Sequence, residues 1–63
     1  MSQPNAASYP QVGKQVVIAD GSQADGDSGV VWHIENGICL VELDSGGIWP
    51  VSEPREIKEK VSQ

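Results

Sequence analysis

The fold is decided by the stretch Gly29-Val-Val-Trp-His-Ile-Glu-Asn-Gly-Ile-Cys-Leu-Val-Glu-Leu-Asp44. It contains two apolar segments joined by Asn36-Gly37. This dipeptide is the strongest short signal for a two-residue β-hairpin turn, because both turn positions need a positive φ that Asn and Gly tolerate best. A two-residue turn fixes the register, so Glu35 should face Ile38 and the other pairs should follow outward along the ribbon. The stretch therefore predicts a hairpin at the centre of the fold.

Alternation along these two strands sorts their side chains onto two faces. The face expected to point inward is apolar throughout: Val30, Trp32, Ile34, Cys39, Val41 and Leu43. The face expected to point outward is mixed: Val31, His33, Glu35, Ile38, Leu40 and Glu42. This sorting predicts that Trp32 belongs to the core.

The outward face is also the predicted interface. A half-apolar patch on a small domain is costly to leave in water, and a polar rim around an apolar centre is typical of protein interfaces. We expect contacts through Val31, His33, Ile38 and Leu40, either with another protein or with a second copy of the chain in a homo-oligomer. The alternative is that the N-terminal arm or the last strand covers this face.

The rest of the chain predicts a small all-β domain. Residues 1–11 carry no charge and two prolines, which is typical of a flexible, disordered arm, so the folded domain should span residues 12–63. Further strands are expected at 13–19, 48–51 and 56–61, although residues 53–61 are also compatible with a helix. Pro50 lacks an N–H, so the fourth strand should lie at an edge or have this position pointing away from its neighbour. A Gly-, Asp- and Ser-rich loop over residues 20–28, and turns over 44–47 and 52–55, complete a closed or nearly closed five-stranded barrel.

Composition narrows the possible functions. The 63 residues carry four Lys/Arg against nine Asp/Glu, and no basic residue lies between Lys14 and Arg55. Nucleic-acid binding depends on Lys and Arg neutralising phosphates, so nucleic acid is not an expected partner. The single Cys39 excludes an internal disulfide. Together with the lack of a signal peptide or long apolar run, it predicts a cytoplasmic protein without membrane contact.

No motif in the sequence specifies catalysis, a cofactor or a metal. Asp25-x-Asp27-x-Gly29 is similar to the start of a calcium loop, but the position that should hold a bidentate Glu is Asn36. His33 could act as a general base, yet no nucleophile, oxyanion donor or metal ligand accompanies it. We therefore predict no catalytic residue, no cofactor and no metal. Ile48 and Trp49 remain candidate contacts for a ligand or peptide, with Trp49 placed either in the core or in a groove.

The pattern resembles the SH3-like small barrels. A similarity to KOW-type modules is carried by three segments, Gly13-Lys-Gln-Val-Val-Ile18, Asp27-Ser-Gly-Val-Val31 and Val41-Glu-Leu43. Many KOW-type modules bind RNA or ribosomal and transcription proteins. That resemblance implies a basic first loop, whereas residues 20–28 are acidic. The segment Ile48-Trp-Pro-Val51 is similar to the plasmid-encoded type II dihydrofolate reductases, tetramers of the same barrel. Gly46 and Gly47 stand where that family has a Val-Gln pair, and its glutamine contacts ligand.

The preferred interpretation is a non-catalytic SH3-like module for protein interaction or assembly. The alternatives are a small oligomeric enzyme of the type II dihydrofolate reductase kind, and a KOW-type RNA- or ribosome-associated module.

Overall fold

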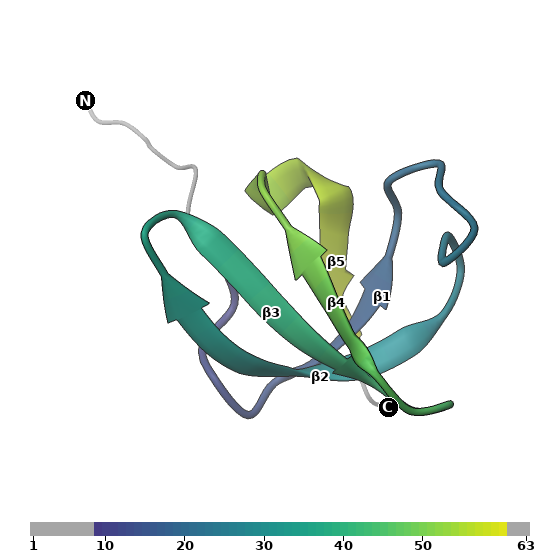
Figure 1. Ribbon diagram of the computed structural model, residues 1–63, viewed down its shortest axis with the longest axis horizontal. Helices are drawn as coiled ribbons and strands as arrows, with labels where there is room; N and C mark the ends of the chain where they lie inside the picture. The colour runs from purple at the N-terminus through teal and green to yellow at the C-terminus, as the bar shows by residue number, and fades with distance from the viewer. Residues whose placement is uncertain (1–8, 61–63) are drawn as a thin grey trace.

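The computed structural model describes residues 9–60, which form an all-β fold (Figure 1). The neighbours in the single sheet are antiparallel and follow the order β4-β3-β2-β1-β5. The all-β prediction is thereby confirmed, with five strands. The elements are β1 (Gln15–Ile18), β2 (Ser28–Glu35), β3 (Ile38–Leu43), β4 (Ile48–Val51), the 3₁₀ helix η1 (Pro54–Glu56) and β5 (Ile57–Glu59).

The central hairpin has the predicted turn. Asn36 and Gly37 have φ angles of 54° and 80°, as a type I′ turn requires. The three pairs next to the turn are also those expected from a two-residue connection: Glu35 with Ile38, Ile34 with Cys39, and His33 with Leu40. The turn chemistry thus fixes the register at this end of β2 and β3.

A β-bulge between Val31 and His33 shifts the register in the other half of the hairpin. Beyond it Val31 faces Val41 and Val30 faces Glu42, so β2 contains one extra residue relative to β3. Val31 is 1% exposed and Trp32 is 54% exposed. The prediction that Trp32 lies in the core and Val31 on the outward face is therefore wrong. It assumed an uninterrupted ladder, and the bulge reverses which residues face inward.

Gly29 allows β2 and β3 to approach closely beyond the bulge. A Cβ at this position would lie 2.5 Å from the Glu42 carbonyl oxygen and 2.7 Å from Val41 Cγ1, closer than real Cβ contacts allow. One position further along the ladder from the Gly29–Leu43 pair, the Asp44 N–H donates to the Ser28 carbonyl at 2.9 Å. The shifted register is therefore held from both sides, and only glycine fits at position 29.

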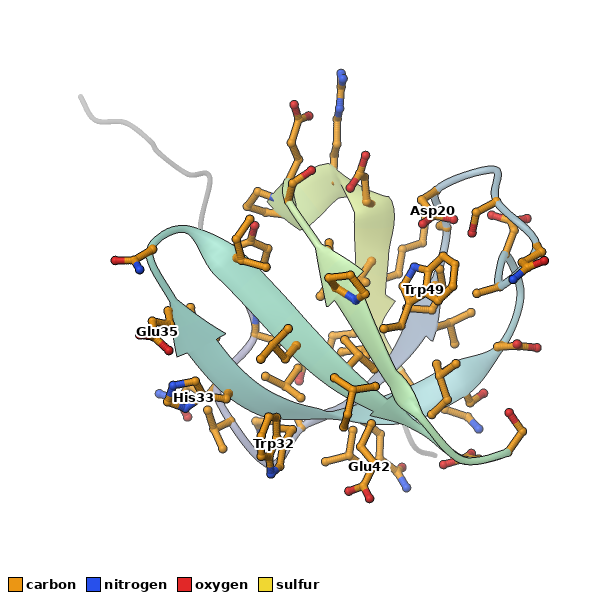
Figure 2. All side chains as sticks on the ribbon, in the orientation of Figure 1. Asp20, Trp32, His33, Glu35, Glu42 and Trp49 are labelled. Carbon is orange, nitrogen blue, oxygen red and sulfur yellow. The ribbon has the colours of Figure 1, made fainter. Side chains whose placement is uncertain are left out.

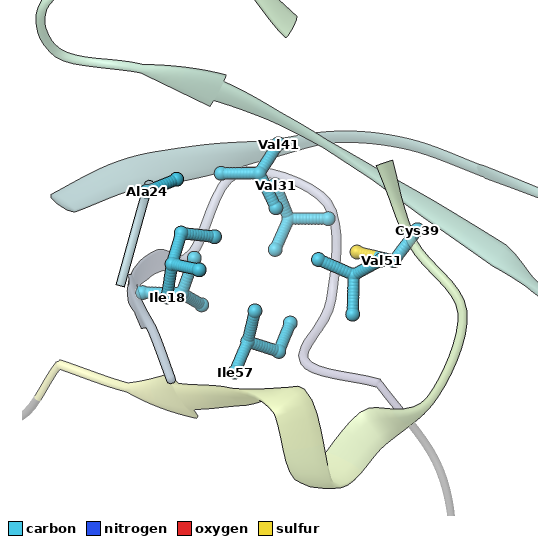
Figure 3. Close-up of a cluster of buried hydrophobic side chains, with 8 residues drawn as sticks. Ile18, Ala24, Val31, Cys39, Val41, Val51 and Ile57 are labelled. Atoms are coloured by element: carbon cyan, nitrogen blue, oxygen red, sulfur yellow. The ribbon is translucent and has the colours of Figure 1, made fainter. Parts of the chain in front are cut away.

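The core is small and mainly aliphatic. The sheet curls so that Ile57 of β5 faces Val31 and Val41 across the interior (Figure 3). Tyr9, Leu43 and Trp49 are partly buried against this cluster. Its buried members are Val16, Ile18, Ala24, Val31, Cys39, Val41, Val51 and Ile57.

The sheet is open, in contrast to the predicted closed or nearly closed barrel, because β4 and β5 are its two edges and do not pair. The Leu43 N–H donates to the Gly47 carbonyl at 2.9 Å, and alternation from this bond makes Leu40–Pro50 a pair without hydrogen bonds. The Pro50 nitrogen therefore faces the free edge, where it offers no donor. On the opposite edge, the Ile57 N–H already donates to the Pro54 carbonyl. These two features leave few groups for a β4–β5 ladder.

The segment before β1 contacts the body of the domain. The Tyr9 hydroxyl lies 2.6 Å from the Gly37 carbonyl oxygen and 3.1 Å from that of Val51, so it joins the hairpin turn to the end of β4. Residue 9, which the sequence assigned to the flexible arm, is thus part of the folded unit. Residues 1–8 of that arm, and Val61 at the expected end of the last strand, lie outside the described residues. Across residues 9–60, no helix is long and apolar enough to cross a membrane.

Gly29→Ala tests the close approach of β2 and β3. The new methyl group clashes with backbone as well as with a side chain, so we expect a loss of about 3 kcal/mol of unfolding free energy, the upper part of the overpacking range. The matched control is Gly47→Ala, which has a φ of 92° and open space around its Cβ position. It should lose only about 1 kcal/mol from backbone strain. Urea denaturation gives both values, and equal losses would contradict the steric argument.

Candidate functional site: the Trp32 face

The bulge places an exposed tryptophan on the outer face of the sheet. Trp32 is 54% exposed and Ile48 is 44% exposed. In Figure 2, Trp32 and Glu42 lie on one side of the β2–β3 ribbon, whereas Trp49 lies on the other. An exposed tryptophan on a strand is unusual because its large ring gains much free energy from burial.

Strand pairing identifies the neighbours of this ring. One row across the sheet is Val30–Glu42–Ile48, and the next is His33–Leu40–Pro50, with Trp32 between the two rows on β2. Val30 and Leu40 are partly buried, and the other members are exposed. We call this surface the Trp32 face, defined as Val30, Trp32, His33, Leu40, Glu42, Ile48 and Pro50.

His33 lies at one side of the Trp32 face. Its Nε2 is 3.3 Å from Glu35 Oε1, and both side chains are more than half exposed. The His33 and Trp32 rings are 5.9 Å apart between centroids, at an angle of 57°. The free thiol of Cys39 is buried on the inner side of β3 and burial raises its pKa, so it is not a nucleophile available to His33. This arrangement provides a polar border beside an apolar ring.

The predicted interface residues are only partly brought together. His33, Ile38 and Leu40 are on the outer side of the hairpin, whereas Val31 is in the core. Trp32, which sequence alternation assigned to the core, takes the outer position instead. The clue available from sequence was Gly29, since a glycine inside a strand pattern often accompanies a bulge or a close backbone approach.

Ile48 and Trp49 point to opposite sides of β4 and do not form one contact site. Trp49 is partly buried against the core, and its indole N–H donates to Asp20 Oδ2 at 3.0 Å. The Asp20 carboxylate also accepts from the Ser22 hydroxyl and, at 2.9 Å, from the Ser22 N–H. Bonds to the Ser22 hydroxyl, the Ser22 backbone and the Trp49 indole hold the pKa of Asp20 below its ordinary value. Trp49 is therefore an anchor for the first loop.

The first loop is ordered by its own contacts. Ala24 is 3% exposed and packs in the core. The Gly21 N–H donates to Asp25 Oδ1 at 3.0 Å, and the Ala24 N–H donates to the Ser22 hydroxyl at 3.1 Å. Within residues 9–60, no three His, Cys, Asp or Glu side chains are grouped so that they could hold a metal ion. The acidic loop is thus a structural element that positions Asp20 for Trp49.

No protein-family model, no curated protein and no solved structure matches this chain. Function is therefore inferred from the geometry of the Trp32 face.

Paired substitutions on β2 test the change of register. Trp32→Ser should change the unfolding free energy by about 1 kcal/mol or less because the ring is largely in water. Val31→Ala should cost about 2 kcal/mol or more because it removes buried methyl groups from a close-packed site. The measurement is the urea midpoint at unchanged slope. A larger loss of unfolding free energy for Trp32→Ser than for Val31→Ala would contradict the bulge and favour the uninterrupted ladder.

The Asp20–Trp49 bond predicts a pH dependence. The folded pKa of Asp20 is lower than its unfolded value, so the stabilisation that its charge provides is present above about pH 4 and is lost as the pH falls through the folded pKa. The Trp49 indole N–H resonance should titrate with Asp20 in an NMR pH series, while that of Trp32 should not follow the same curve. Asp20→Asn should remove this titration. A Trp49 indole signal that ignores acidification would contradict the bond.

Proposed function

We propose that this chain is a non-catalytic protein-interaction module with an SH3-like fold, and that the Trp32 face is its docking surface. The single observation that carries the proposal is the 54% exposure of Trp32, the largest side chain of β2. Strand order, the tight hairpin and the 3₁₀ turn between β4 and β5 support the SH3-like assignment.

The composition of the Trp32 face is suited to binding. Tryptophan is among the residues that contribute most to protein interfaces, because it buries a large rigid area at little cost in conformational entropy. Leu40 and Ile48 extend the apolar centre onto β3 and β4, while His33 and Glu42 supply polar groups beside it. This combination of an apolar centre and a polar border is the general anatomy of an interface.

The bulge also supports the proposal. Bulges re-aim side chains and are frequent at functional sites. Here the bulge moves the largest side chain of the hairpin out of a domain with a small core, which sacrifices burial that a chain of this length could use. Such a placement is understandable when Trp32 is buried by a partner in the assembled state.

The edges of the sheet favour docking on a face. A partner strand added beside β4 would meet Pro50, which has no N–H to donate at the free edge. The β5 edge is three residues long and is followed by Lys60. Association through the outer side chains of β2, β3 and β4 is therefore favoured over the addition of a strand at either edge.

Site-specific photocrosslinking tests this function. A benzoyl-bearing phenylalanine analogue in place of Leu40 should give protein adducts in cells that produce the chain, because Leu40 is next to the centre of the Trp32 face. The same analogue in place of the exposed Lys58 is the control, since β5 lies across the core from β2 and β3. A dimer-sized adduct would identify a second copy as the partner. Adducts from neither position, or equal yields from both, would contradict the proposal.

A further inference from the structure

Every charged side chain on β2, β3 and β4 other than a histidine is acidic. These strands span residues 28–51, entirely within the interval from Lys14 to Arg55 that contains no Lys or Arg. Glu42 faces Val30 on one neighbouring strand and Ile48 on the other, so it lies diagonally across from Trp32. Glu35 lies two residues beyond His33 on β2. The apolar centre of the Trp32 face thus has carboxylates on two sides.

The basic residues lie elsewhere and are partly occupied. Lys14 Nζ is 3.8 Å from Glu59 Oε2, and Arg55 Nε is 2.6 Å from Glu53 Oε1. Within residues 9–60 Glu42 takes part in no ion pair, and Glu35 has only His33, whose ring is charged only when protonated. The carboxylate of Glu42 is therefore available to an external cation.

We propose that the Trp32 face binds a basic protein segment, one that presents apolar side chains flanked by arginine or lysine. The inference rests on the proposed docking function and names the chemistry of the partner. An apolar group would cover Leu40 and Ile48, while a guanidinium would pair with Glu42 and stack on the exposed ring of Trp32.

Charge complementarity favours such a segment over the other occupants. In a symmetric dimer both copies would contribute this same face. The Glu35 and Glu42 carboxylates of one copy would then lie in one interface with those of the other. Like charges across an interface are unfavourable. Nucleic acid and anionic lipid surfaces are repelled by the same carboxylates. A basic protein segment satisfies both the apolar centre and the acidic border.

Three short peptides of equal length provide the probes. The first has three leucines flanked by two arginines on each side; the second has the same leucines flanked by glutamates; the third keeps the arginines around three serines. Each is titrated into the ¹⁵N-labelled 63-residue chain at about 0.1 M salt, where surface charges still act over about 10 Å. The readout is the Trp32 indole N–H with the amides of residues 30–42, and the Trp49 indole serves as the internal reference.

The arginine–leucine peptide should give saturable shifts at these positions and leave the Trp49 indole in place. Trp32→Ser should weaken its binding about ten-fold or more, as expected for the loss of a central aromatic contact. Glu42→Gln should weaken it about three-fold, and Lys58→Gln on β5 should leave it unchanged within error. Trp32→Ser keeps the core intact, so loss of binding in that variant is not a folding effect, and the Trp49 indole signal checks this.

Equal affinity for the glutamate–leucine peptide at the same residues would overturn the basic partner while leaving the docking surface intact. Equal affinity for the arginine–serine peptide would reduce the effect to general charge attraction and also overturn the proposal. Shifts at residues 30–42 that grow with protein concentration in the absence of peptide would show self-association through this face. They would overturn the proposal in favour of a second copy of the chain as the occupant. No saturable shift with the arginine–leucine peptide at millimolar concentration rejects the proposal. The docking function is tested separately by the crosslinks, and it fails if position 40 gives no adducts or no more than position 58.

Discussion

The one-residue mismatch between the two ends of the β2–β3 ladder determines the rest of this structure. At the turn, Asn36-Gly37 pairs Glu35 with Ile38. At the other end, Gly29 allows the strands to approach closely and the Asp44 N–H bonds to the Ser28 carbonyl. These two sets of pairs differ by one residue, so β2 must accommodate an extra residue between them. The bulge at Trp32 is that accommodation, and it decides which side chains form the core and which form the outer face.

The division of labour among the three aromatic residues follows from this arrangement. The largest fully buried side chains are those of Ile18, Val16, Val31, Val41, Val51 and Cys39, so no aromatic ring fills the centre. Tyr9 and Trp49 lie at its border, where each has an apolar body against the core and a polar tip bonded to a distant segment. Trp32 alone faces outward. A domain with so small a core is marginal by itself, and a partner that bound the folded state would stabilise it by mass action.

Features encoded by local chemistry could be predicted from the sequence. The Asn36-Gly37 turn, the five strands and the edge position of β4 follow from positive φ, from alternation and from the missing N–H of Pro50. The face of Trp32 could not be derived in this way, because strict alternation from the turn has no place for an extra residue. The hydrogen bonds of Tyr9 with Gly37 and Val51, and that of Asp20 with Trp49, join residues 28 to 42 positions apart, so no local sequence pattern predicts them. The same limit applies to the site: His33, Ile38 and Leu40 were expected on the outer side, whereas its central ring was not.

Nuclear Overhauser contacts of the two β2 side chains Val31 and Trp32 test the central claim most directly. We expect the Val31 methyl protons to contact those of Val41, the partner of Val31 on β3, and those of Ile57, which faces Val31 across the interior. We also expect the Trp32 ring protons to contact only outer-face groups such as Leu40 and His33, and their signals to be broadened by a paramagnetic agent dissolved in the water. Contacts from the Trp32 ring to Val16, Val41 or Ile57, together with broadening of the Val31 methyl signals by that agent, would contradict the bulge and with it the proposed docking face.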